Sequence, residues 1–339
     1  RWTVDQLRHG SLVGPERLQW LEHLYLEVVD RWGAFSEGGR PEPAGAAIAR
    51  QLGTAATPGG GGAHWPPPRL EPLLCPPLEG EGAWRARDPA FVTSVRGAPP
   101  LLCSTVLRTD RERPRSSLVY ITAWDPAWVQ LSWVAGTMEP RSAHGHAGVG
   151  RVPRERVHRL VAGFNGGFQA ADGAFGMRTP AGPFLPPVPY AATIATLPGG
   201  RLGLGTWPGS GARERDYPSY RQNLSPLVED GQVNPYRRAF WGGVPRELAD
   251  TSRTDRTGLC LTEEGLMAYL WGRRVTVEGL ARGMTAARCV YGLMLDINFS
   301  NTAFETYRVD RREDLPPLGR PLDRELEAEG AVPGREDLA

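Results

Sequence analysis

Residues 290–298 read Val-Tyr-Gly-Leu-Met-Leu-Asp-Ile-Asn, six uncharged residues followed by a polar end. An apolar run of this length is typical of a β-strand that is covered on both faces. The run ends in Asp296-Ile297-Asn298, so an acidic and an amide side chain are expected where the strand ends. We therefore predict a central strand that ends at Leu295 and carries a candidate site at Asp296 and Asn298. An N-cap role for Asp296 is the alternative.

The segment before this strand predicts how it is connected. A β-rich run over 266–271 is followed by Thr276, a residue type that caps the N-termini of helices. The helix after it would place four apolar side chains on one face: Val277, Leu280, Ala281 and Met284. Strand, helix and strand in this order imply a crossover, and ligands gather at the carboxyl ends of such strands. We expect an α+β fold with a mixed β-sheet core, this crossover and peripheral helices.

Shorter β-rich runs alternate with turn residues through the same region and predict further strands and hairpins. The predicted pairs are 117–124 with 129–134, 191–197 with 201–207, and 257–261 with 266–271. A further strand over 159–164 is halted by Asn165-Gly166-Gly167. These runs predict one domain over residues 73–309.

Both ends of the chain differ in composition from this domain. Within residues 1–35, apolar side chains recur at helical spacing from Pro15 to Trp32, which predicts an amphipathic helix. Residues 36–72 are rich in glycine and proline and predict an irregular linker, and residues 310–339 predict a charged, proline-containing tail. The chain begins at Arg1, so we expect that an upstream signal or anchor is removed and that the protein is extracytoplasmic: secreted, periplasmic or in the cell envelope.

The basic residues exclude several classes of enzyme. The sequence contains no lysine, so all 39 basic residues are arginine. P-loop nucleotidases, pyridoxal-phosphate enzymes and protein kinases each depend on a lysine and are excluded. The net charge of +1 indicates that nucleic acid is not the partner. No stretch has the roughly 20 apolar residues that a membrane span requires.

The four cysteines lack the spacing of a zinc site. Because Cys260 and Cys289 fall on strands that we expect to be neighbours, they are the first candidate disulfide, with Cys75–Cys103 as the second. Disulfides would suit an exported protein. Four buried thiols are the alternative.

The turn after the strand at 159–164 is a candidate anion site. The glycines of Asn165-Gly166-Gly167 would let backbone amides approach an anion, beside the side-chain amide of Asn165. Asn-Gly is also a common hairpin turn, and that simpler interpretation stays open.

Other polar residues could bind a polar or anionic ligand. Arg256, just before a predicted strand, is a candidate phosphate fork, with Arg253 as a weaker competitor. The adjacent amides of Gln222 and Asn223 could bind sugar hydroxyls, or belong to a turn and an edge strand. His144 and His146 are weak metal candidates because no third ligand has suitable spacing. No cofactor is indicated, although a divalent cation is a further candidate.

Several segments resemble, in order, the phosphodiester glycosidase family that includes the lysosomal uncovering enzyme and many bacterial proteins associated with exopolysaccharide. The matching stretches are LVAGFNGGF (160–168), the hairpin that ends at Trp207, RQNLSPLVEDG (221–231), RTGLCLTEEGLMAYLWG (256–272) and GLMLDINFSNTAFETY (292–307). Much of the family has Asp-Gly-Gly where this chain has Asp296-Ile297-Asn298. The chain therefore resembles a bacterial variant that keeps the acid and lacks the two glycines.

This resemblance implies a hydrolase that acts on sugar-1-phosphodiester bonds of a cell-envelope or exported glycan. Asp296 would act as base or nucleophile and Arg256 would bind the phosphate, with Asn165 beside them. Asp172 or Glu305 could be a second carboxylate. The competing hypothesis is a non-catalytic glycan-binding or scaffold module of an envelope protein. In both, the partner is a carbohydrate or sugar phosphate.

Overall fold

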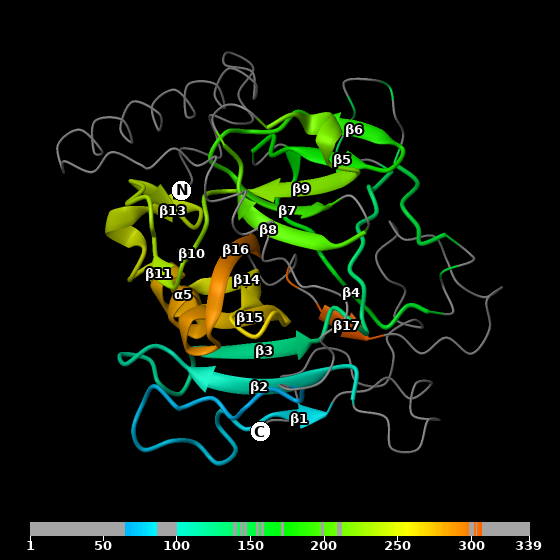
Figure 1. Cartoon of the computed structure of the whole chain (residues 1–339). Helices are drawn as coiled ribbons and strands as arrows, with labels where there is room; N and C mark the ends of the chain where they lie inside the picture. The colour runs from blue at the N-terminus through cyan, green and yellow to red at the C-terminus, as the bar shows by residue number, and fades with distance from the viewer. Residues whose placement is uncertain are drawn as a thin grey trace.

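The computed structural model describes most of the central part of the chain (Figure 1). The described residues are 65–86, 100–137, 140, 142, 145, 148–153, 156, 159–170, 173–197, 200–208, 212–297, 302 and 304–306. The expected helix over 15–32, most of the expected linker and the tail from 310 lie outside them. Residues 65–72 form neither helix nor strand.

An eight-stranded sheet is the centre of the fold, with the strand order β1-β2-β3-β15-β14-β16-β10-β11. Its strands are β1 (Arg85–Ala86), β2 (Cys103–Arg108), β3 (Leu118–Trp124), β10 (Val228–Glu229), β11 (Gln232–Val233), β14 (Thr254–Thr262), β15 (Met267–Val275) and β16 (Cys289–Ile297). All its hydrogen-bonded pairs are antiparallel. The expectation of a mixed sheet is therefore wrong for the strands described.

The predicted crossover is present as β15, α5 (Val277–Ala286) and β16. The Thr276 side chain accepts a hydrogen bond of 2.9 Å from the backbone of Gly279, so the predicted N-cap is confirmed. β14 lies between β15 and β16 and is antiparallel to both, so β15 and β16 run in the same direction without pairing. Among the described residues, α5 is the helix that covers this sheet, and the other expected peripheral helices are not seen.

β16 lies inside the sheet, as its apolar run predicted, between β14 and the short β10. Close packing against α5 explains the glycine in this run. A Cβ atom at Gly292 would collide with the sulfur of Met284, so the absence of a side chain lets the helix approach the strand.

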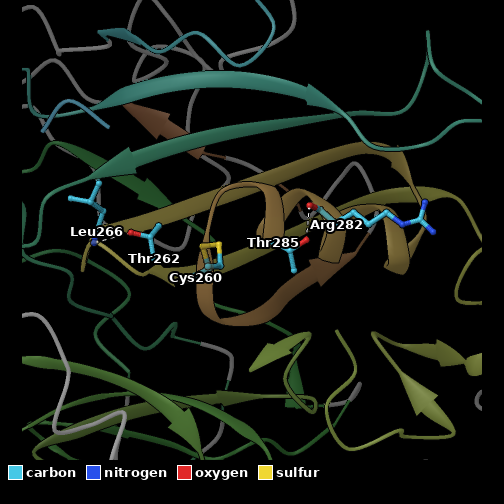
Figure 2. The surroundings of a disulfide bond; sticks show 6 residues. Cys260, Thr262, Leu266, Arg282 and Thr285 are labelled. Carbon is cyan, nitrogen blue, oxygen red and sulfur yellow. Dashed lines mark hydrogen bonds between the residues drawn. A yellow bond between two sulfur atoms is a disulfide. The ribbon is translucent and has the colours of Figure 1, made fainter. Parts of the chain in front are cut away.

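The predicted disulfide between Cys260 of β14 and Cys289 of β16 is present, with 5.8 Å between the Cα atoms (Figure 2). The other predicted disulfide is wrong: Cys75 is exposed and Cys103 is buried, and no disulfide joins them.

A second, five-stranded sheet has the order β6-β5-β9-β7-β8. Its strands are β5 (Met177–Thr179), β6 (Gly182–Leu185), β7 (Ala192–Thr196), β8 (Leu202–Thr206) and β9 (Ser219–Asn223). The remaining elements are β4 (Ala162–Phe164), β12 (Phe240–Trp241), β13 (Val244–Pro245), β17 (Phe304–Thr306) and the 3-10 helices η2 (Glu214–Asp216) and η3 (Arg246–Leu248). The hairpins β7–β8 and β14–β15 confirm two predicted pairs. The strand expected over 129–134 is wrong, because this segment is irregular.

The main sheet buries apolar side chains on both faces. On one face, Val119 and Leu270 pack in a cluster with α5 residues that include Leu280. On the other face, Leu259 and Leu293 pack with side chains that include Ile194 and Leu204 of the second sheet. Their spacing along the strands explains the layers, since β-strand side chains alternate between faces. The fold is thus a helix, the eight-stranded sheet and the five-stranded sheet in layers.

Candidate active site

The candidate site lies where β16 ends, at an irregularity in its pairing with β14. Gly258 pairs with Met294 and Arg256 pairs with Ile297. The single residue Thr257 therefore faces two residues of β16, which is the arrangement of a β-bulge. Bulges redirect side chains and are common beside active sites. The bulge carries Asp296, the residue that the sequence places at the end of this strand.

Both carboxylate oxygens of Asp296 accept hydrogen bonds. Oδ1 accepts from the backbone N–H of Ile297 at 2.7 Å, and Oδ2 accepts from the side-chain amide of Asn165 at 2.7 Å. Asp296 is 7% exposed, so its position is more enclosed than the end of a strand suggests. The structure thus brings two predicted catalytic residues into direct contact.

Aromatic packing holds Asn165 in this place. The preceding residue, Phe164, ends β4, and its ring stacks on Phe304 of the paired strand β17 with 5.8 Å between ring centroids. The same ring lies 5.0 Å from that of Tyr269 on β15. The end of β4 is therefore fixed onto the face of the main sheet that lies opposite α5.

Tyr269 also contributes to the electrostatics of the site. Burial raises the pKa of its hydroxyl well above the usual value, the hydrogen bond with Thr257 lowers it, and the charge of Asp296 raises it further. Tyr269 therefore stays neutral and can act as a hydrogen-bond group beneath the carboxylate.

The turn after Asn165 is exposed at Gly166, and nothing occupies the space where a Cβ atom of this residue would lie. Gly167 has a φ of +123°, and its Cβ position lies 3.2 Å from the Asn223 side chain. Because an L-residue is strained at this φ and crowded there, glycine is required at position 167. The open side at Gly166 leaves room for a ligand beside the turn.

Arg221 of β9 lies behind this turn and was not among the residues that we predicted. Its guanidinium donates to the carbonyls of Phe168 at 2.6 Å and Phe175 at 2.9 Å. Burial lowers its pKa to about 10, and the nearby charge of Asp296 acts in the opposite direction. Within the described part of the chain, no carboxylate pairs with Arg221 in a salt bridge. A buried cation thus lies next to the turn and to Asp296.

Three polar groups of the turn have no hydrogen-bond partner among the described residues. They are the buried Oδ1 atom of Asn165 and the backbone N–H groups of Gly166 and Gly167. Buried polar groups are normally paired, so the Asn165 oxygen marks a place where a water molecule can bind, while the N–H of the exposed Gly166 is open to solvent or to a ligand. Together with Arg221, the two glycine N–H groups offer donors and positive charge to an anion, whereas the Asn165 oxygen can only accept a hydrogen bond.

The adjacent amides of β9 bind the protein itself. Gln222 is fully buried, accepts from the backbones of Gly176 and Val188, and donates to Thr193. Asn223 donates to the carbonyls of Met294 and Leu295 at 2.7 and 2.6 Å. It also accepts from the backbone of Phe168. Asn223 therefore links the turn to the end of β16. We expected both amides to face a ligand, but both bind the protein instead.

Arg256 is also placed differently from our expectation. Its side chain is 0% exposed, and its guanidinium donates to the carbonyls of Val275, Gly242 and Ser252. It pairs across the strands with Ile297, which packs in the cluster on the α5 face. The observed burial leaves no place for a phosphate on this guanidinium.

The weaker arginine candidate, Arg253, binds Asp110 at 2.7 Å and Glu112 at 2.8 Å. These two contacts make Arg253 part of a peripheral ion-pair cluster.

The remaining candidates give less information. Asn298, Asp172, His144 and His146 lie outside the described residues. Glu305 is on β17, opposite Gly163. Among the residues that the structure describes, no three histidine, cysteine, aspartate or glutamate side chains gather in a way that would hold a metal ion. In the same residues, no helix has the length and apolarity needed to cross a bilayer.

Comparisons with known proteins give remote likenesses of fold. No protein-family model matches the chain, and no curated protein matches its sequence. The catalytic domain of zebrafish N-acetylglucosamine-1-phosphodiester alpha-N-acetylglucosaminidase, auto-inhibited by its pro-peptide, aligns with a TM-score of 0.44 and 15% identity, over 70% of this chain and 86% of that one.

Two bacterial structures align at lower scores. A hypothetical protein from Synechocystis has a TM-score of 0.40 and 11% identity, over 61% of this chain and 60% of its own. A Burkholderia pseudomallei K96243 protein described as exported has a TM-score of 0.28 and 12% identity, over 71% and 76% of the two chains.

Proposed function

We propose that this protein is a hydrolase that cleaves the bond between a sugar C1 atom and phosphate in a sugar-1-phosphodiester of an envelope or exported glycan. The observation that carries the proposal is the 2.7 Å hydrogen bond between Asn165 and Asp296. It joins two of the segments that resemble the glycosidase family. Arg221, from a third such segment, lies close enough to Asp296 for their charges to interact.

The phosphate is bound, in this proposal, by the turn and by Arg221. The N–H groups of Gly166 and Gly167 point to no partner in the described residues, and Arg221 supplies positive charge behind them. A guanidinium and backbone amides are strong partners for phosphate oxygens. Arg221 thus takes the role that the sequence suggested for Arg256.

Asp296 acts at the sugar carbon, as base for a water molecule or as nucleophile. Ordinary glycosidases use two carboxylates because an alcohol leaving group must be protonated. A phosphodiester leaves as a stable anion and needs less help, so one carboxylate and a bound phosphate suffice. Asn165 orients the Asp296 carboxylate through Nδ2, while its buried Oδ1 atom has no hydrogen-bond partner among the described residues.

The Asp-Ile-Asn variant is compatible with this role for Asp296. The backbone N–H of Ile297 still binds the carboxylate, and its side chain anchors the strand end in the apolar cluster. A Cβ atom at Gly243 would collide with this side chain, which indicates close packing there. The anchor fixes the direction of Asp296 where the family pattern has glycine.

A glycan-binding module without catalysis is the second candidate. The observation that favours it is the enclosure of Asp296, which is 7% exposed and hydrogen-bonded at both oxygens. A carboxylate held in this way could position Asn165 for a sugar without itself reacting. The same residues would then bind a sugar phosphate and release it unchanged.

Turnover of a panel of sugar-1-phosphodiesters separates the two functions. We expect the wild type to release the free sugar and Asp296→Asn to be slower by at least about a hundredfold. Asp216→Asn, at an exposed surface carboxylate, is the matched control and should keep full activity. Binding of a sugar phosphate by calorimetry, with no turnover of any compound by the wild type, would support the binding module instead.

The disulfide supports an extracytoplasmic location for either function. Bonds such as Cys260–Cys289 form and persist in oxidising compartments and are rare in the cytosol. A substrate in the cell envelope or outside the cell fits this location.

A further inference from the structure

A group of exposed arginines lies at one end of the main sheet, where β2 and β15 end, and does not belong to the candidate site. We call it the arginine surface; its members are Arg111, Arg113, Arg115, Arg273 and Arg274. Three belong to the connection between β2 and β3, and two lie near the end of β15. Although the whole chain is almost neutral, positive charge is concentrated here.

Direct contacts show that the two parts of the arginine surface adjoin. The Ser117 hydroxyl donates to the carbonyl of Arg274 at 2.8 Å. Arg273 pairs with Leu118, the first residue of β3, in the register of β15 and β3. The β2–β3 connection therefore lies against the end of β15 (Figure 1).

The acidic side chains that contact this region leave most of its charge uncompensated. Asp110 and Glu112 both bind Arg253, which is not a member of the surface. Asp255 accepts from the backbone N–H of Arg274 and not from its guanidinium. In the described parts of the chain, none of the five guanidinium groups forms an ion pair with a carboxylate. The surface thus presents positive charge to solvent.

The arginine surface and Asp296 lie at the same end of the sheet. β2 and β15 end there, β3 and β14 begin there, and β16 ends there with Asp296-Ile297. Three strand spacings separate β16 from β3, and each is about 4.8 Å, so the distance across the edge is about 15 Å. One phosphate at the site cannot reach the arginines, but a chain of phosphodiester-linked units can.

We propose that the arginine surface binds the continuation of an anionic, phosphodiester-linked polymer whose end lies at Asp296. This choice of ligand rests on the proposed function, in which the site binds a phosphate, and on the position of the arginine surface about 15 Å away at the same end of the sheet. Arginine guanidinium groups suit this task because they bind phosphate oxygens through two hydrogen bonds. The substrate is then a polymer and not a small sugar phosphate.

An anionic membrane is the competing partner for such a surface. Peripheral binding to membranes usually combines basic residues with apolar side chains that enter the interface. None of the exposed large apolar side chains found in the described residues belongs to the β2–β3 connection or to β15. The composition of the surface therefore favours a soluble polyanion.

Binding measurements with defined probes test the proposal. The probes are a synthetic poly(glycerol phosphate) chain, the glycerol phosphate monomer, and phosphatidylglycerol vesicles, all at low salt. The test variant carries Arg→Gln at all five members of the surface. The matched control carries Arg→Gln at five other accessible positions, so that both variants lose the same charge: Arg85, Arg151, Arg159, Arg201 and Arg215.

We expect the wild type and the control to bind the polymer and the test variant to bind at least about tenfold more weakly, with a reduced salt dependence. Monomer binding should be equal in all three. If the five substitutions prevent folding, two smaller variants take the place of the test variant: Arg273→Gln/Arg274→Gln and the triple variant in the β2–β3 connection. Each should show part of the loss of polymer binding. Equal loss in test and control variants, or tighter arginine-dependent binding to vesicles than to polymer, would overturn the proposal.

Failure of this proposal can be distinguished from failure of the proposed hydrolase function. Arginine-dependent polymer binding without hydrolysis of any phosphodiester would refute the hydrolase and leave this surface assigned. If the wild type hydrolyses the polymer and the five substitutions do not change its KM, the proposed role of the arginine surface is refuted. The proposed hydrolase function is then retained.

Discussion

The hydroxyl of Thr257 binds both backbone groups of Asp296. Its Oγ1 atom accepts from the Asp296 N–H at 3.0 Å and donates to the Asp296 carbonyl at 3.2 Å. A β-bulge leaves one residue without regular ladder partners, and this hydroxyl takes their place. Thr257 is completely buried, so a side chain that is closed to solvent helps to hold the backbone of Asp296 in place.

Replacing Thr257 by valine should therefore reduce turnover because it displaces Asp296, and not because it removes a group that takes part in the reaction. Valine has the same shape but removes the hydroxyl to which both backbone groups of Asp296 are hydrogen-bonded, which destabilises the fold by about 2 kcal/mol. We expect kcat to fall about tenfold to a hundredfold, because small displacements of a catalytic group have effects of this size. Thr257→Ser retains the hydroxyl and should recover most of the activity, as steady-state kinetics can establish.

Arg221→Lys should weaken substrate binding more than it slows the chemical step. An ammonium group cannot reach the carbonyls of Phe168 and Phe175 together, so the turn loses support and the phosphate loses a fork. We expect KM to rise about tenfold or more with a smaller change in kcat. Arg213→Lys, at an exposed ion pair, is the control. An unchanged KM in Arg221→Lys would show that the phosphate binds elsewhere.

Glu229 lies between the two sheets and should make the free energy of unfolding depend on pH. This carboxyl is 4% exposed and accepts from Thr206 of the second sheet at 3.1 Å. Burial raises its pKa above the ordinary 4.5, hydrogen bonds with Tyr236 and Thr206 lower it, and the charge of Asp230 raises it. The net shift is upward, so the protonated form stabilises the folded state. This contribution is complete below pH 4.5 and disappears as the pH rises through the folded-state pKa.

Thermal unfolding of Glu229→Gln across this pH range tests the shift. Glutamine is neutral at every pH, so the wild type should lose stability relative to the variant as the pH increases above 4.5. A constant difference between the two melting temperatures from pH 4 to pH 8 would show that the carboxyl has an ordinary pKa.

Loss of the disulfide should destabilise the whole domain. The bond joins two interior strands and closes a loop with a sequence separation of 29. A loop of this length corresponds to about 3–4 kcal/mol in the free energy of unfolding. The double variant Cys260→Ala/Cys289→Ala should lose this amount in denaturant unfolding. Cys75→Ala is the control, because its exposed thiol forms no disulfide and should not alter stability.

Local sequence patterns predicted the part of the fold that depends on neighbours in the chain. The apolar run before Asp296 predicted an interior strand, and Thr276 predicted the start of α5. Glycine-containing turns predicted the β7–β8 and β14–β15 hairpins. In each, a short-range rule and the final packing favour the same structure.

The antiparallel order and the second sheet could not be predicted in this way. That β14 lies between β15 and β16 depends on pairing across the whole domain, which no short window of sequence contains. The segment 129–134 has the composition of a strand but has no strand partner in the described residues, which shows how far tertiary context decides β structure.

The site was predicted only where its residues lie at strand ends. Asn165 follows β4 and Asp296 is the second-last residue of β16, and their side chains meet. Arg256 resembles a phosphate ligand in sequence, but the face on which a strand residue lies decides its role, and Arg256 faces the interior. Arg221 begins one of the segments that carry the family resemblance. That position in the sequence was the available signal.

The strand order also has a consequence for the order of folding. β14 and β15 are joined by a short turn and can form early, as local hairpins do. β16 must then add to the far edge of β14 after α5 has crossed the sheet. Asn165 must reach Asp296 over 131 residues of chain, a contact with a large loop-closure entropy. We therefore expect the hairpin to belong to the folding nucleus and the Asn165–Asp296 pair to assemble last, so that substitutions at the pair accelerate unfolding and leave the folding rate nearly unchanged.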